Sequence, residues 1–261
     1  MNLISKLIVS TVISVAGVAI AGQCGGTLII RKGALVFSGC INDPIAERFI
    51  VEINKNPKDI IIQSTGGDAL AAIRMAKAIY KNNSSLVIRG VCYSACANYL
   101  MPAAKNVVVE DGAIIGYHGD IRILGKQQFI DFIDKNKHPN PRISKKDQLR
   151  GVIYVFKQEM ELAKMISRVA RTHDLQMVAT APTDTYVPLK NKKSSMLCKG
   201  QGNLPWFPAL QLLKDLNLID EIMNDNNELF SDLERIDIND LKELNFTSST
   251  SENPELGCKT I

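Results

Sequence analysis

Short apolar runs alternate with longer amphipathic stretches through the first half of the chain. The runs III at 60–62, LVIRGV at 86–91 and VVV at 107–109 each end in a polar or glycine-containing segment, and helical spacing follows the first two. Short continuous apolar runs are typical of strands buried on both faces, and strands that alternate with helices indicate a parallel sheet. The predicted fold class is therefore α/β, with a mostly parallel sheet wrapped by helices.

The segments before this region predict a strand pair and a helix. Residues 26–41 contain β-forming residues on both sides of Gly33, and residues 43–56 have helical spacing. Asp43 is placed to cap that helix.

The alternation breaks after residue 118. Residues 119–151 form a polar insertion, either a lid that contacts substrate or a solvated loop. An amphipathic helix is predicted over 152–172, packed in the core or in a subunit interface. Its apolar stripe comprises Val152, Val155, Phe156, Met160, Ala163, Ile166 and Val169 or Ala170.

The last third of the chain contains the predicted end of the domain and a C-terminal extension. Residues 208–222 predict a helix that leads into a short closing strand, so a single α/β domain is expected over 23–223. Residues 224–261 read as an acidic helical extension with a tail low in apolar residues. The tail is expected to be flexible unless a disulfide holds Cys258.

The N-terminus has the anatomy of an export signal. One cation, Lys6, precedes an apolar stretch at 7–20 that contains no charge. This stretch is short for a membrane span, and the small residues that follow suit cleavage by a signal peptidase. We predict a signal peptide at 1–22 and a periplasmic or secreted chain. The alternatives are an uncleaved anchor facing the periplasm and a lipoprotein acylated at Cys24, and only these imply membrane association.

Charge and cysteine content bear on nucleic-acid binding, disulfide bonds and metal binding. The chain has 31 Lys+Arg against 27 Asp+Glu and no long basic run interleaved with aromatics, so nucleic acid is not an expected partner. In an exported chain, six cysteines allow up to three disulfides, whose pairing the sequence leaves open. A metal site is not expected, because the close pair has no second close pair of ligands, and no cofactor is expected. The cysteines are Cys24, Cys40, Cys92, Cys96, Cys198 and Cys258.

Three turns carry candidate chemistry. Ser94 lies where a predicted strand gives way to a helix, so nearby amides point toward any oxyanion its attack creates; a serine here is also a common N-cap. Gly66 and Gly67 end the preceding strand and allow close approach of the backbone to a ligand, although any tight turn uses glycines. His118 ends a third apolar run, where a histidine is either a base or structural.

These three segments resemble a known family. IIIQSTGGD at 60–68, GVCYSACANYLMPAA at 90–104 and IIGYHG at 114–119 are similar to consecutive blocks of the Clp protease peptidase subunit, within the crotonase-like superfamily. The similarity covers 27–119 and recurs at 208–220. The Cys-x-Ser-Ala-Cys form resembles an exported subgroup of Clp-like proteins.

The resemblance implies a crotonase-like ββα spiral and a serine peptidase that acts by acyl transfer. In it Ser94 is the nucleophile, His118 is the base, and the amides of Gly67 and Ala95 hold the oxyanion. The resemblance also implies a homo-oligomer assembled through the helical arm, with a peptide or an unfolded protein as substrate. An ATPase partner is not expected for an exported enzyme.

The third member of the catalytic set and two other functions remain open at this stage. Asp184 stands where the family's aspartate precedes an aromatic-containing segment, so we choose it to orient His118, with Asp174 as the second choice. Related enzymes such as signal peptide peptidase A use a serine–lysine dyad, for which Lys105 would be the base. The chain could also be an inactive binding or scaffold protein of the same fold, or an acyl-CoA enzyme, against which export argues.

Overall fold

The computed structural model describes residues 25–57, 59–118, 144–181, 185–190, 195–201, 206–223 and 258–260. The predicted signal peptide, residues 119–143 of the insertion and residues 224–257 of the acidic extension lie outside the described residues. Within the described ranges, no helix combines the length and the apolarity needed to cross a bilayer.

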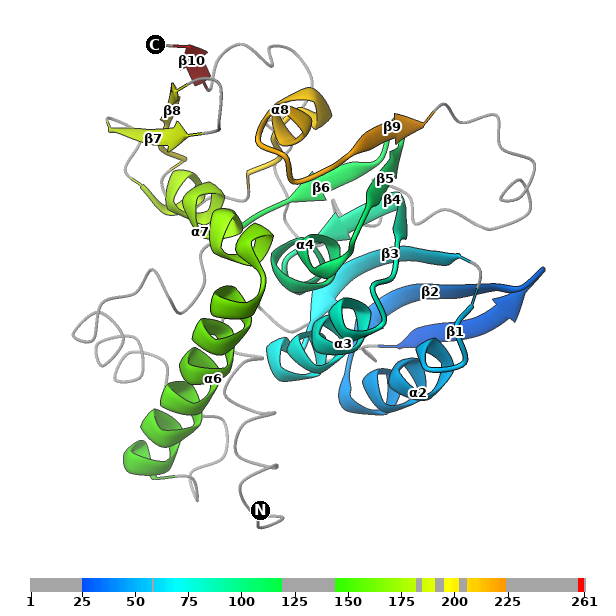
Figure 1. Ribbon diagram of the computed structural model, residues 1–261. Coiled ribbons are helices and arrows are strands. Elements are labelled where there is room, and N and C mark those ends of the chain that lie inside the picture. Colours follow the sequence, from blue (N-terminus) through cyan, green and yellow to red (C-terminus); the bar gives the residue numbers. More distant parts are fainter. Residues whose placement is uncertain are drawn as a thin grey trace.

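A seven-stranded sheet forms the centre of the molecule (Figure 1). The strand order is β1-β2-β3-β4-β5-β9, and β6 pairs with the end of β4. Strand β1 is antiparallel to β2, and the other pairs of this sheet are parallel. The predicted α/β class with a mostly parallel sheet is confirmed. The strands are β1 (Gly26–Arg31), β2 (Ala34–Ile41), β3 (Ile60–Gly67), β4 (Leu86–Tyr93), β5 (Val107–Glu110), β6 (Ile114–Gly116) and β9 (Glu221–Met223).

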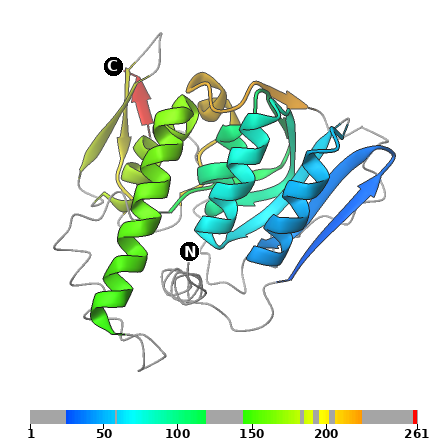
Figure 2. The ribbon, with the colours of Figure 1, turned by 60° about the horizontal axis from the view of Figure 1, so that its bottom comes forward.

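Helices α2, α3 and α4 lie together on one face of this sheet, as two views of the ribbon show (Figures 1 and 2). Helices α6 and α7 follow each other along the side of this helical layer (Figure 2). The helices are α2 (Asp43–Ile53), α3 (Ala69–Lys81), the π-helix η1 (Cys96–Leu100), α4 (Met101–Ala103), α6 (Lys145–Met165), α7 (Ser167–Thr180) and α8 (Leu210–Asp215).

The main core lies between the sheet and these helices. Phe37 of β2 and Ile62 of β3 are fully buried, as are Met75 and Ile79 of α3. Burial of one such side chain is worth about 1.5–3 kcal/mol, so this layer orders the strands whose ends carry the candidate chemistry.

The predicted strand pair and helix at the start of the domain are confirmed, with one change. Lys32 and Gly33 form the two-residue turn between β1 and β2, and both have positive φ, +48° and +83°, as a tight hairpin requires. Asn42 caps α2, since its side chain accepts a bond from the Ile45 amide at 3.0 Å. The predicted cap, Asp43, instead lies in the first turn.

The helix predicted over 152–172 is two helices. Helix α6 starts at Lys145, because the Ser144 hydroxyl caps it by accepting a bond from the Asp147 amide at 3.2 Å. Residues 144–151 are therefore helical and capped, where a polar insertion was predicted. Ile166, with φ −125° and ψ 103°, ends α6, and α7 begins at the next residue.

Part of the predicted apolar stripe is wrong. Val152 and Val155 are buried, but Phe156 and Met160 are 40% and 38% exposed. Glu159 is buried in their place and accepts a hydrogen bond from the Tyr99 hydroxyl. A polar side chain thus occupies the core-facing side of α6, and an apolar row faces outward.

A second, three-stranded antiparallel sheet lies beyond α7 (Figure 1). Its strands are β7 (Tyr186–Lys190), β8 (Ser195–Lys199) and β10 (Cys258–Thr260). A disulfide joins Cys198 to Cys258 across β8 and β10, so the tail is held at that cysteine. The helix and closing strand predicted over 208–222 are present as α8 and β9.

Candidate active site

Ser94 occupies the turn between β4 and η1. Its φ is +56°, a left-handed conformation that costs a residue with a side chain roughly 1–2 kcal/mol. The neighbouring residues 91–93 and 95–100 are buried, whereas Ser94 is partly exposed. Strain of this kind gathers at functional sites, and here it brings a hydroxyl to the surface at the carboxyl end of a parallel strand.

Two backbone hydrogen bonds hold this turn. The Ser94 amide donates to the Gly116 carbonyl of β6 at 3.1 Å, and the Asn98 amide donates to the Ser94 carbonyl at 2.8 Å. The first bond fixes Ser94 to the neighbouring strand, and the second ties it to the helix that follows. The two bonds use the backbone of Ser94 and leave its hydroxyl outside the helix start.

His118 meets Ser94 at this edge of the sheet. The Ser94 Oγ lies 2.6 Å from the His118 Nε2, which is hydrogen-bond distance. Tyr117, just before the histidine, exchanges two backbone bonds of 2.8 Å with Trp206, so the segment is fixed on both sides. The structure brings together the two residues that the sequence predicted to form the nucleophile–base pair.

Sequence reasoning missed an aromatic pair that lies beside His118. The Tyr93 ring centroid is 5.4 Å from that of His118 at an interplanar angle of 55°, and 5.9 Å from that of Phe207, with which it stacks. Gly116 permits this packing, because a Cβ there would lie 2.5 Å from the Phe207 Cε1 and 2.6 Å from the Tyr93 Cδ2. Burial raises the pKa of the Tyr93 phenol, which keeps that hydroxyl protonated at neutral pH.

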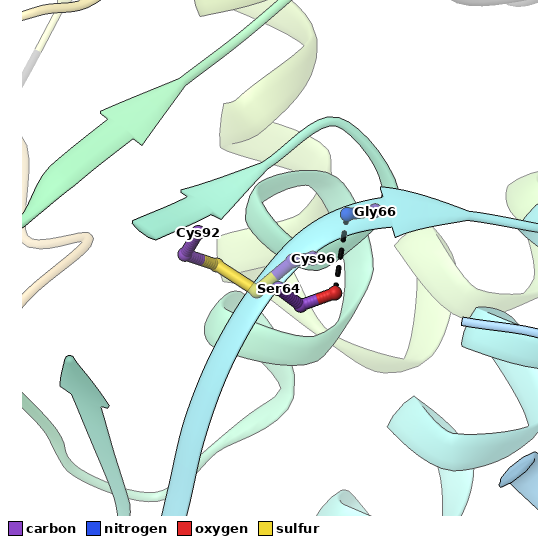
Figure 3. The surroundings of a disulfide bond; sticks show 4 residues. All are labelled: Ser64, Gly66, Cys92 and Cys96. Atoms are coloured by element: carbon purple, nitrogen blue, oxygen red, sulfur yellow. Dashed lines mark hydrogen bonds between the residues drawn. A yellow bond between two sulfur atoms is a disulfide. The ribbon is translucent and has the colours of Figure 1, made fainter. Parts of the chain in front are cut away.

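The two glycines that end β3 have different surroundings. A Cβ on Gly66 would lie 2.7 Å from the Ser94 Cβ and 3.0 Å from the Ala95 nitrogen, so Gly66 is the residue that packs against the nucleophile turn. The Gly66 amide donates to the Ser64 Oγ at 3.1 Å (Figure 3). Gly67 is exposed, and its backbone lies against Ile41 of β2.

Cys92 and Cys96 form a disulfide that joins the end of β4 to the start of η1 (Figure 3). Both residues are fully buried. Cys40 is also disulfide-bonded, and no cysteine of the described residues is a free thiol. Neither cysteine of this turn can therefore act as a thiol nucleophile.

Of the two candidates for the third catalytic position, the structure describes only Asp174. Asp184 lies outside the described residues. Asp174 lies on α7 next to His173, largely open to solvent; the partial desolvation of its carboxyl raises the pKa of that group against the opposing effect of the histidine. In the part of the chain that the structure describes, no hydrogen bond or ion pair links Asp174 to His118.

Lys105 does not fit the serine–lysine alternative. It is exposed and precedes β5, at the edge where the parallel strands begin, whereas Ser94 follows β4 at the opposite edge. The dyad needs a buried lysine beside the serine, so Lys105 is not its base. The described residues also include no group of three or more His, Cys, Asp or Glu side chains arranged to hold a metal ion.

The chain matches no protein-family model and no curated protein. Among solved structures, it is similar to a mutant of ClpP1 from Listeria monocytogenes, with 15% sequence identity. The alignment covers 76% of this chain and 94% of that chain, at a TM-score of 0.42. A TM-score of this size does not transfer the activity of that protein to this chain.

Proposed function

We propose that the protein is an exported serine peptidase in which Ser94 is the nucleophile and His118 is the general base. The observation that carries the proposal is the 2.6 Å separation of the Ser94 Oγ and the His118 Nε2, at a serine held in a left-handed turn. A serine needs a base within such reach before it can attack a carbonyl carbon. A simple N-cap would instead turn its hydroxyl to the helix amides.

The reaction proceeds by acyl transfer. His118 takes the proton of the Ser94 hydroxyl as the oxygen attacks the scissile carbonyl carbon, and the resulting tetrahedral oxyanion collapses with loss of the amine, which receives that proton. Water then attacks the acyl-enzyme with the same histidine as base. Asp184 is the proposed partner that orients the His118 ring.

The amides of Gly67 and Ala95 are the proposed oxyanion donors. The Gly66 amide is already bonded to Ser64, so it is not available. Gly67 is exposed at the end of β3, and Gly66 beside it lies against Ser94 and the Ala95 nitrogen.

Short peptides and unfolded segments are the proposed substrates. An exported enzyme has no ATP-driven unfoldase beside it, so a folded protein would have to expose its own chain. Degradation of an unfolded casein-like substrate, with a folded protein left intact, is the expected result. Equal degradation of both would contradict this substrate class.

Export is proposed from the N-terminal signal, and the disulfides support it. The bonds Cys92–Cys96 and Cys198–Cys258 persist in oxidising compartments and are rare in the cytosol. The proposed location is the periplasm or the medium, with membrane association only if the N-terminal segment is not cleaved.

A homo-oligomer is proposed through the outward face of α6. Ile153, Phe156 and Met160 follow one another at helical spacing there and are each at least 38% exposed. A row of apolar side chains on a helix surface favours a partner of the same kind. Light scattering of the intact protein and of Phe156→Glu, a change that adds charge to this row, checks the proposal.

A fluorophosphonate probe tests the catalytic proposal directly. We expect the folded protein to be labelled and Ser94→Ala to show no labelling, with Ser144→Ala as a matched hydroxyl control that keeps the signal. If the folded protein remained unlabelled, the inactive binding protein would be the better description.

A further inference from the structure

We infer that the Cys92–Cys96 disulfide positions the Ser94 side chain for catalysis, an inference that rests on the proposed function. The bond closes a loop with a sequence separation of only four, and Ser94 is its middle residue. The Cα atoms of the two cysteines are 5.3 Å apart. A covalent tie over so short a segment leaves the turn few alternative conformations.

One end of this tie is fixed in the sheet. Cys92 is paired in register with Ser64 of β3 on one side and with Ile115 of β6 on the other. Its side chain is fully buried, as is that of Cys96. Because Cys92 is held in the sheet, the disulfide also holds Cys96, the first residue of η1, in place.

The helix that starts at Cys96 has no side-chain cap. Its N-cap residue is Ala95, and no side chain accepts a bond from its first amides. A π-helix of five residues is also a rare and short element that forms poorly by itself. The nearest hydroxyl, that of Ser94, would be the usual cap, but it lies against His118.

The disulfide therefore takes over the role that a cap has in other helices. It holds the start of η1 to β4 and leaves the Ser94 hydroxyl available to the histidine. Without the bond, the left-handed Ser94 can relax to a right-handed conformation, in which its hydroxyl turns to the helix amides. The loss would appear in the rate of attack by Ser94 rather than in the binding of a probe.

The test compares two disulfide deletions, Cys92→Ala/Cys96→Ala and, as the matched control, Cys198→Ala/Cys258→Ala. The rate constant of fluorophosphonate labelling at saturating probe is expected to fall at least tenfold in the first variant, with unchanged half-saturating concentration. The control is expected to label like the wild type. Hydrogen exchange at the Ser94 and Asn98 amides is expected to accelerate at least tenfold in the first variant only.

Each outcome decides the inference separately from the proposed function. Wild-type labelling with an equal rate constant in Cys92→Ala/Cys96→Ala would overturn the positioning role and leave the peptidase proposal intact. If the wild type were not labelled, the peptidase proposal would fail, and the exchange rates alone would decide whether the bond holds the turn. A second variant, Cys92→Val/Cys96→Ala, keeps more of the buried volume; if neither variant folded, the bond would be required for folding and the inference would be wrong.

Discussion

Gly66 lies against Ser94 so closely that no side chain fits between them. A Cβ on Gly66 would be 2.7 Å from the Ser94 Cβ and 2.7 Å from the Tyr93 carbonyl oxygen, at a φ of +91°. The nucleophile turn and the turn that ends β3 are therefore in direct contact. Glycine is therefore required at position 66 for two reasons: it leaves room for Ser94, and it adopts the positive φ without strain.

Gly66→Ala is expected to reduce fluorophosphonate labelling about 100-fold, because a displacement of the nucleophile by about 1 Å costs that much. Gly112→Ala is the matched control, since Gly112 also has positive φ, +78°, and no described atom lies within 4 Å of a Cβ there. Both variants carry backbone strain, but only Gly66→Ala also meets neighbouring atoms, so its melting temperature should fall further. A similar loss of labelling in both would show that strain, and not the contact with Ser94, is responsible.

His118→Ala is expected to lower the labelling rate by about 10²–10⁴-fold, the usual contribution of a general base. His173→Ala is the control, because His173 has the same residue type and lies on α7, which does not carry the serine–histidine pair. The measurement is the rate constant of labelling with each variant shown to be folded by circular dichroism. Labelling of His118→Ala at the wild-type rate would contradict the role of His118 as general base.

The meeting of Ser94 and His118 at one edge of the sheet could be predicted from local pattern and one topological rule, whereas their roles as nucleophile and base are what the family resemblance implies. Each follows an apolar run, and the carboxyl ends of parallel strands meet at one edge of the sheet. The capping alternative could not be excluded in this way, since it depends on the direction of a single hydroxyl. The 2.6 Å contact with the His118 ring gives that direction.

Other parts of the structure depend on contacts between distant segments. The pairing of β8 with β10 joins residues separated by 60 positions, and neither short segment has a strong strand pattern. The apolar stripe predicted for α6 is partly wrong because Glu159 is buried, with its carboxylate bonded to the Tyr99 hydroxyl. The periodicity of apolar residues does not predict such a contact. Likewise, the aromatic pair beside His118 joins Tyr93 to Phe207 across more than half of the domain.

The buried ion pair of Arg89 and Glu110 offers a test of how β4 and β5 are held together. The Arg89 Nε lies 3.4 Å from the Glu110 Oε2, and the side chains are only 6% and 3% exposed. Removal of one partner leaves a buried charge, so Arg89→Met and Glu110→Leu alone are each expected to lower the free energy of unfolding by about 3–5 kcal/mol. Arg89→Met/Glu110→Leu should lose much less. Urea unfolding of both single variants and the double variant measures the coupling; additive losses would contradict it.

Asp68, which follows the glycine turn and caps α3, links stability to pH. Its side chain accepts a bond from the Ala71 amide at 2.7 Å. Burial raises the pKa of the Asp68 carboxyl above 3.8, and the nearby Asp43 adds to this effect. The hydrogen bonds to the carboxyl and the charge of Arg74 lower the pKa, but burial outweighs them. The folded state therefore binds this proton more tightly than the unfolded state. The stability contributed by Asp68 is full below pH 3.8 and falls as the pH rises through the raised pKa.

Asp68→Asn keeps the acceptor for the Ala71 amide and removes the ionisation. Its free energy of unfolding at pH 7 is expected to equal or exceed that of the wild type, and the difference should grow as the pH rises above 3.8. Asp68→Ala, which also loses the cap, should be about 1 kcal/mol less stable than Asp68→Asn. Urea unfolding from pH 4 to pH 7 measures the three proteins. An Asn variant as unstable as the Ala variant would mean that the charge of Asp68 stabilises the fold, and that burial does not dominate its titration.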